Sequence, residues 1–240
     1  MKSKLDWFIF LIILILIAVS TALAAPTGPS SVTNLGSSRY TSAEAANISA
    51  VAGNVTELDF MANTVTNAWQ GYFGNITGTI VLGNSNNQSM YNWNSSSPTG
   101  QIYATRTSSV PAWASIRCAD QTAVDLEDLA LGVDSSVDQD AVNRTFLNTT
   151  SFNAFYVGSR NINNSQDCRA VQLFNSSGIS SNDFSEVLLS DTSNIIYTGL
   201  VTTPKTGFDN REHQFEMLVG ENGHNGDTTA TPYYFYIELN

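Results

Sequence analysis

Charged side chains are scarce in this sequence, and histidine and lysine are the scarcest. Of 240 residues, 13% are charged, two are histidine and three are lysine, of which only Lys205 lies beyond the first four positions. The sequence has no basic cluster, and its net charge is −11. Such a chain repels phosphate groups, so the composition argues against nucleic acid and anionic membrane surfaces as partners.

Motifs of the common catalytic classes are missing as well. The sequence has no Gly-X-Ser-X-Gly, no phosphate-binding loop and no His-Glu-X-X-His. His213 and His224 have no cysteine or histidine at the spacing of a zinc site. Pairs of carboxylates for glycoside hydrolysis are inevitable among 21 acidic residues and carry little weight. We therefore predict that the protein is not an enzyme, and a secreted hydrolase is the weakest alternative.

The N-terminus has the pattern of an export signal. A basic head is followed by an unbroken apolar run at residues 7–19, and Ala22-Leu23-Ala24 fits the small-X-small rule for signal peptidase. We predict that residues 1–24 are a signal peptide. Two alternatives stay open, an uncleaved membrane anchor and a pilin-type leader that is cut before the apolar run. Contact with a membrane is expected only if this segment is retained.

Residues 25–43 are rich in Pro, Gly, Ser and Thr, and they predict a flexible linker. An alternative use of this segment is as a strand donated to a neighbouring molecule. The mature chain is long enough for one large β domain or two small ones, and we expect residues 44–240 to form a single domain.

Asparagine, serine and threonine dominate the polar residues and create many acceptor sequences for N-glycosylation. Random placement of 24 Asn and 52 Ser and Thr would produce about five sequons, so the composition is a firmer signal than the count of nine. An exported chain with such a surface is expected to be a glycoprotein. The sequon asparagines are Asn47, Asn54, Asn75, Asn87, Asn94, Asn143, Asn148, Asn163 and Asn175.

The chain has two cysteines, Cys118 and Cys168. An even pair in an exported protein predicts a disulfide. Closing a loop of this length would stabilise the fold by about 4 kcal/mol in the chain-entropy model. Two free thiols are the alternative, which the oxidising compartment disfavours.

Many short segments of aromatic and β-branched residues, separated by Gly- and Asn-rich turns, predict an antiparallel β-sandwich of Ig-like or jelly-roll-like type. Strands are expected within residues 46–60, 69–82, 90–93, 100–106, 154–157, 169–174, 186–189, 195–201, 214–219 and 233–239. A short helical insert interrupts them around residues 121–146. Its first helix is expected to end at Gly132, and its second to begin with a capping box at residues 136–139.

One Gly-rich loop concentrates oxygen ligands of the type that Ca²⁺ prefers, at Glu221, Asn222, Asn225 and Asp227. The spacing does not match an EF-hand, and a hairpin loop that uses Asn and Gly for positive φ is the favoured interpretation. We therefore expect no cofactor, with Ca²⁺ as the alternative.

Four aromatic residues are candidates for stacking on sugar rings, although packing in a core or sheet is the favoured role of each. They are Trp69, Tyr72, Trp93 and Trp113.

Five blocks of sequence are similar to segments of a known group of proteins. They are AGNVTELDF, TNAWQGYFGNITGTIVLGN, MYNW, GQIYATR and the C-terminal HQFEMLVGENGHNGDTTATPYYFYIELN. Together they resemble a recurrent domain of uncharacterised secreted surface proteins of small-genome archaea, over about residues 45–240. The resemblance implies an exported cell-surface domain and assigns no catalytic residue.

These observations lead to the expectation of an extracellular, structural cell-surface protein, an N-glycosylated subunit of a filament or surface layer. Its expected partners are copies of itself or other cell-surface proteins. A secreted module that binds carbohydrate or Ca²⁺ is the alternative.

Overall fold

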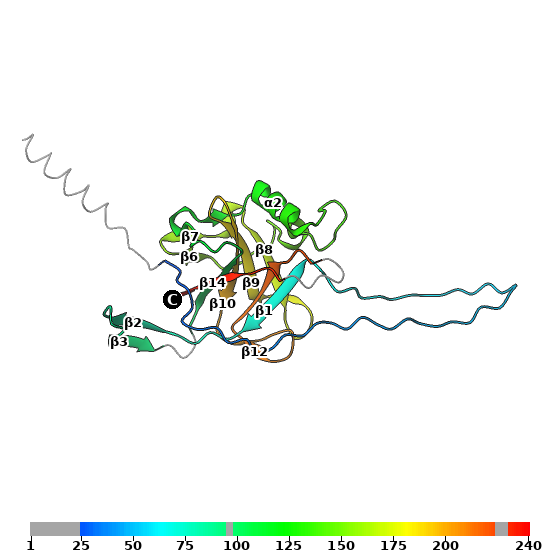
Figure 1. Cartoon of the computed structure of the whole chain (residues 1–240), viewed down its shortest axis with the longest axis horizontal. Helices are drawn as coiled ribbons and strands as arrows, with labels where there is room; N and C mark the ends of the chain where they lie inside the picture. The colour runs from blue at the N-terminus through cyan, green and yellow to red at the C-terminus, as the bar shows by residue number, and fades with distance from the viewer. Residues whose placement is uncertain (1–24, 95–97, 224–229) are drawn as a thin grey trace, which may run out of the picture.

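The computed structural model describes residues 25–94, 98–223 and 230–240. The predicted signal peptide, residues 1–24, lies outside these ranges. Strands account for 36% of the described residues and helices for 10%, and the sheets are antiparallel. The predicted mostly-β class, consistent with a β-sandwich, is therefore confirmed. Figure 1 shows a packed body with two extensions that leave it in opposite directions.

The strands follow one another along the chain with two helices and two 3₁₀ turns between them. The strands are β1 (Trp69–Gly74), β2 (Thr79–Gly83), β3 (Ser89–Asn94), β4 (Gly100–Thr105), β5 (Arg117–Cys118), β6 (Phe155–Val157), β7 (Arg160–Ile162), β8 (Arg169–Phe174), β9 (Ser180–Ser190), β10 (Ile195–Val201), β11 (Lys205–Thr206), β12 (Glu212–His213), β13 (Phe215–Gly220) and β14 (Tyr234–Leu239). The helices are α2 (Gln121–Leu131) and α3 (Val142–Thr145), and the 3₁₀ turns are η1 (Trp113–Ser115) and η2 (Asn164–Gln166).

A six-stranded sheet forms the centre of the body. Its strands run in the order β14-β4-β10-β9-β5, and β8 also pairs with β9. Every residue of β4 and β10 is buried. Successive side chains of a strand point to opposite faces, so this sheet must be covered on both sides. That is why β10 is almost entirely apolar in sequence instead of alternating with polar residues.

The first core lies on one face of the central sheet. Ile102 of β4 and Tyr197 of β10 contribute to it, and the β1–β13 ribbon covers them with Met217. Leu131 of α2 and Phe146 complete this layer. The close approach of α2 to β13 explains why residue 220 is a glycine, because a Cβ at this position would lie 2.5 Å from Leu131 Cδ1.

The second core lies on the opposite face of the same strands. Tyr103 is adjacent to Ile102 in sequence, yet it belongs to this core, together with Ile196 and Leu189. The β6–β7 hairpin covers them with residues that include Phe155 and Ile162. The sheet therefore lies between two apolar layers.

The beginning of the predicted linker is attached to the central sheet. The Thr27 N–H donates to the Ile237 carbonyl at 3.0 Å, and the Ile237 N–H donates to the Thr27 carbonyl at 2.8 Å. Pro26 beside this bridge is buried. The segment from residue 30 onward is exposed, so the attachment is limited to the first few residues.

The predicted disulfide is confirmed. Cys118 and Cys168 are bonded, with their Cα atoms 4.8 Å apart. Cys118 pairs with Leu189 of β9, and Cys168 directly precedes β8, which also pairs with β9. The bond therefore ties together the two segments that flank the helical insert and the β6–β7 hairpin.

Helix α2 is confirmed close to its predicted place. Asp120 is its N-cap, and its Oδ1 accepts a hydrogen bond from the Ala123 N–H at 2.9 Å. Gly132 ends the helix in the left-handed region, with φ 69°. Asp128 links the two helices, because its Oδ1 accepts from the Val142 N–H at 2.7 Å.

The predicted capping box at residues 136–139 is wrong. Helix α3 begins only at Val142, and the preceding residues form turns. The Asp134 side chain accepts from Ser136, and the Asp138 side chain accepts from the Asp134 N–H at 2.7 Å. These local bonds satisfy the backbone in a turn and compete with a helix start.

The predicted strands from residue 69 onward are present, but the one expected within residues 46–60 is absent. That segment has no strand and no sheet partner among the described residues. A strand needs hydrogen bonds to a neighbour, and an alternating sequence by itself supplies none. Four short strands were not predicted at all: β5, β7, β11 and β12.

Candidate assembly surfaces

The segment between residues 39 and 67, which we call the arm, is a long extended excursion from the body. Its base is closed by a hydrogen bond of 2.9 Å from Arg39 Nη2 to Asn67 Oδ1. Its tip is a turn in which the Asn54 N–H donates to the Val51 carbonyl at 3.2 Å, with Gly53 at φ 87°. Each leg has about 13 residues and so reaches at most about 45 Å. Figure 1 shows both legs running out together from the body.

The return leg of the arm is fixed to the body at its base, where the Gly223 N–H also donates to the Asn67 carbonyl at 3.0 Å. Thr66 Oγ1 donates to Asp140 Oδ2 at 2.5 Å, and the Trp69 indole N–H donates to the Asp140 carbonyl at 2.5 Å. The Trp69 ring then packs against Phe146 and Tyr197 in the first core. These contacts therefore hold the base of the arm against the body.

Nothing in the described part of this chain covers the arm. Every residue from Ser30 to Thr64 is exposed, with Phe60 at 80% and Met61 at 96% of full exposure. Unstructured loops of such length are uncommon in packed domains and are usually functional or disordered. The exposed large apolar residues of the arm are Tyr40, Ile48, Val51, Val55, Leu58, Phe60 and Met61.

The second extension is the hairpin of β2 and β3. Its turn is closed by the Asn84 N–H, which donates to the Gln88 carbonyl at 3.0 Å. The strands pair with each other and with no other strand among the described residues. An isolated two-stranded hairpin is marginally stable in water, because it buries little on either side.

One side of this hairpin is apolar. Ile80 lies opposite Trp93, and Leu82 lies opposite Tyr91. Residues two apart in a strand share a face, so these four side chains lie together. Each is about half exposed, and the Tyr91 and Trp93 rings meet edge to face with centroids 4.9 Å apart. We call these four residues the hairpin face.

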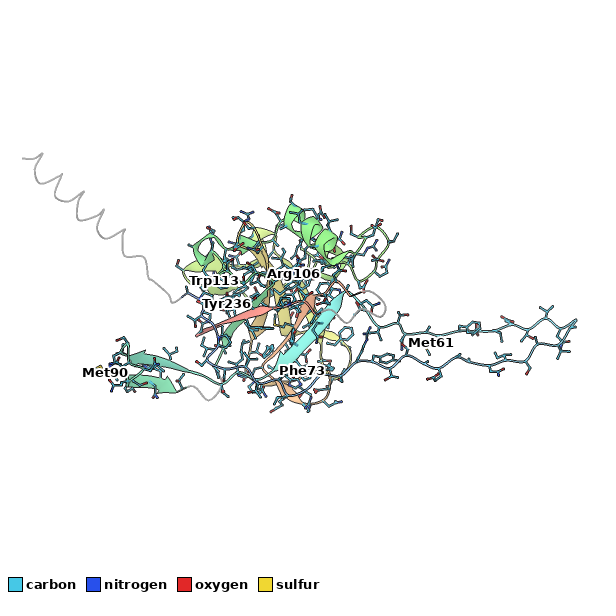
Figure 2. All side chains as sticks on the ribbon, in the orientation of Figure 1. Met61, Phe73, Met90, Arg106, Trp113 and Tyr236 are labelled. Atoms are coloured by element: carbon cyan, nitrogen blue, oxygen red, sulfur yellow. A yellow bond between two sulfur atoms is a disulfide. The ribbon has the colours of Figure 1, made fainter. Side chains whose placement is uncertain are left out.

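The arm and the hairpin lie at opposite ends of the long axis of the molecule (Figure 1). Figure 2 shows Met61 on the arm and Met90 on the hairpin, each outside the packed body. Two apolar extensions that point in opposite directions present different surfaces at the two ends of one molecule.

The two extensions differ in charge. Residues 60–105, which include the whole hairpin, contain no charged side chain. Residues 25–105 carry one basic and three acidic side chains, a net charge of −2, whereas residues 106–240 carry seven basic and 17 acidic side chains, a net charge of −10. The hairpin therefore carries no charge, whereas Arg39, Glu44, Glu57 and Asp59 all lie in the arm.

The predicted glycosylation sites differ in their accessibility. Asn47, Asn54, Asn75, Asn87 and Asn148 are exposed, and three of these lie near the arm tip or in the hairpin turn. Asn143, Asn163 and Asn175 are partly buried. Asn163 Nδ2, the atom that would carry a sugar, donates to Asn161 Oδ1 at 2.6 Å. The side chain of Asn94 lies outside the described residues.

The proposed Ca²⁺ loop is described only in part, because Asn225 and Asp227 lie outside the described residues. Glu221 is engaged within the protein, since its Oε1 accepts from Thr231 Oγ1 at 2.8 Å. In the described ranges, no group of three or more His, Cys, Asp or Glu side chains is arranged to hold a metal ion.

One histidine, His213, is described, and it is buried beside Asp209. Its Nε2 lies 2.8 Å from Asp209 Oδ1, and its ring packs on Phe73. Burial opposes ionisation of Asp209, but hydrogen bonds from Arg211 and His213 lower its pKa to about 2. This cluster closes the turn between β11 and β12.

Two buried carboxylates, those of Glu127 and Glu238, connect different elements by hydrogen bonds. Glu127 of α2 accepts from Tyr197 Oη at 2.8 Å and pairs with Arg106. Burial raises the pKa of Tyr197, and the neighbouring Glu127 carboxylate raises it further. Glu238 of β14 binds Tyr103 Oη at 2.9 Å. Each acid therefore bonds to a partner from another element.

Of the four aromatic residues considered for sugar stacking, two are accessible. Trp93 belongs to the hairpin face, and Tyr72 is partly exposed beside Phe235. Trp69 packs into the first core, and Trp113 packs between Tyr103 and Tyr236. In Figure 2, Trp113 and Tyr236 lie next to each other.

Sequence reasoning did not identify the hairpin face or the arm as exposed apolar surfaces. It predicted both as ordinary strands of the sandwich, because their residues have strand-like composition. For the hairpin, one available signal was the absence of charge from residues 75–99, since a solvated segment of that length normally carries charges.

None of the helices within the described residues is long and apolar enough to cross a membrane. Comparison of the chain with protein-family models, with curated proteins and with solved structures finds no match.

Proposed function

We propose that this protein is a structural cell-surface subunit, N-glycosylated, that assembles into an extracellular filament or surface layer. The observation that carries the proposal is the pair of apolar extensions, which have no partner within the described part of the chain. Soluble monomers rarely expose large apolar surfaces of this kind, and such surfaces usually mark interaction sites.

The direction of the extensions favours a polymer over a closed dimer. A contact between two different surfaces at opposite ends of a molecule is heterologous, and it generates an open chain of subunits unless the rotation closes a ring. The disulfide is consistent with this setting, because disulfides persist in oxidising compartments such as the cell exterior. The exposed sequons would add neutral, hydrated sugar to the remaining surface.

The proposal predicts polymers that depend on protein concentration. We expect the purified protein to sediment as large assemblies at high concentration and to show regular filaments or sheets by negative-stain electron microscopy. A variant in which residues 41–65 are replaced by a short Gly-Ser linker should remain monomeric.

The body of that deletion variant should melt at an unchanged temperature, because none of residues 41–64 is buried. A full-length protein that stays strictly monomeric at every accessible concentration would contradict the proposal.

A carbohydrate-binding module is the second candidate. It is favoured by the exposed Tyr91 and Trp93 rings, which offer an aromatic platform outside the body. Glycan-array binding that disappears in Trp93→Ala, by a protein that forms no polymers, would support this candidate over assembly.

A further inference from the structure

Residues 55–60 have the pattern of a strand but pair with no other segment in the described part of the chain. Leu58 and Phe60 alternate with Glu57 and Asp59, as in a strand with one apolar and one polar face. The segment is extended and exposed, and the one backbone hydrogen bond described between the two legs of the arm lies at the tip. The described ranges of its own chain therefore leave the peptide groups of this segment open to another strand.

Within the described ranges, the hairpin of β2 and β3 has free edges to which a further strand could pair. It has two strands, an apolar face and unpaired outer edges among the described residues. Three or more strands with an apolar face are the usual minimum for a stable small sheet. Adding an extended segment at a free edge is a common way to bind a peptide, because main-chain hydrogen bonds supply affinity and alternate side chains supply specificity.

The arm cannot serve the hairpin of its own molecule. The two extensions lie at opposite ends of the long axis, with the body between them (Figure 1). A neighbour placed end to end would bring its arm to this hairpin. Since the hairpin carries no charge, a strand with Glu57 and Asp59 on its outer face meets no like charge there.

We propose that residues 55–60 of one copy add as a third strand to a free edge of the β2–β3 hairpin of the next copy. Leu58 and Phe60 then lie beside the hairpin face, and Glu57 and Asp59 stay in water. Asn54 remains at the turn that precedes the donated strand, so a sugar there lies outside the new sheet. This inference rests on the proposed function and specifies how its subunits join.

A pair of matched variants tests the donated strand. Leu58→Asp places a charge on its apolar side and should raise the protein concentration needed for polymers by about tenfold or more. Leu129→Asp introduces the same change at an exposed leucine of α2, on the body, and should leave that concentration unchanged. Equal effects of the two variants would overturn the inference.

Mixed cysteine variants test the recipient. Chains with Leu58→Cys are mixed with chains that carry Leu82→Cys or Tyr91→Cys, under mild oxidation and in the presence of the native disulfide. We expect disulfide-linked dimers of the two chain types, and the hairpin position that reacts faster identifies the edge that is used. Chains with Leu129→Cys are the control and should not react with Leu58→Cys chains.

Three results would overturn the inference in different ways. Predominant linkage of Leu58→Cys chains to each other would show that arms pair with arms. Polymers that form without any arm-to-hairpin linkage would reject the inference but leave the proposed function standing. Absence of polymers from the unmodified protein would reject the proposed function, and the inference with it.

Discussion

Glu186 is a fully buried carboxyl group in the middle of β9. Its Oε2 accepts from the Leu218 N–H at 2.7 Å, and its Oε1 has no partner among the described residues. Burial raises its pKa well above the usual value, and the Leu218 hydrogen bond opposes this only in part. The residue thus binds its proton more tightly in the folded than in the unfolded chain.

This gives a prediction for the pH dependence of stability. A raised folded pKa means that the contribution of Glu186 is complete below the unfolded pKa and is lost as the pH rises through the folded pKa. Glu186→Gln keeps the acceptor for Leu218 but cannot ionise. We expect its free energy of unfolding to exceed that of the wild type by about 1 kcal/mol or more at pH 8.

The gain from Glu186→Gln should shrink toward pH 4, and urea denaturation of both proteins between pH 4 and 8 measures this difference. Other carboxylates titrate in both proteins, so their effects cancel. A difference that does not change with pH would contradict the assignment of the proton to Glu186.

Among the elements, α2 shows how a local signal sets a boundary. Asp120 caps its first turn, and Gly132 ends it in a conformation that other residues adopt at a cost. Between these ends, Glu127 and Asp128 face the body, where they bind Tyr197 and the start of α3. The helix therefore covers the first core with a face that is partly polar.

Asp120→Ala should lower the free energy of unfolding by about 1 kcal/mol, because it leaves the Ala123 N–H without its acceptor. Asp125→Ala is the matched control. It removes the same charge from the same helix but breaks only a surface hydrogen bond with Gln121, which should cost about 0.5 kcal/mol or less. Chemical denaturation of the two variants compares them directly, and equal losses would mean that the cap is not the cause.

At the scale of the whole molecule, the disulfide joins two distant segments of the chain next to β9. Cys118 and Cys168 are separated by 50 positions in sequence, and the segment between them includes α2, α3 and the β6–β7 hairpin, so the bond closes a loop that spans both faces of the central sheet. The extensions, by contrast, lie outside this loop. None of the arm residues from 39 to 64 is buried in either core.

Replacing both cysteines by serine should lower the free energy of unfolding by about 4 kcal/mol. That is a large part of the stability of an ordinary domain. Dithiothreitol should bring the wild type to the stability of the double variant and should leave the variant unchanged. A wild type whose unfolding midpoint does not move with the reductant would show that the bond does not form in solution.

The sequence alone determined the β class, the disulfide partners, helix α2 with its glycine cap, and most strands after residue 69. These features depend on local signals, namely the alternation of side chains, turn residues and the pairing of two lone cysteines. The short strands β5, β7, β11 and β12 escaped prediction, because two or three residues carry no measurable period.

Only the tertiary structure decided which strand-like segments acquire partners. Residues 55–60 and the β2–β3 hairpin resemble the core strands in composition, yet they lie outside the body with their apolar side chains exposed. The physical reason is that strand pairing is non-local. A segment's own residues fix which side chains share a face, but only the arrangement of all the other strands determines whether an edge is left for it within the same chain.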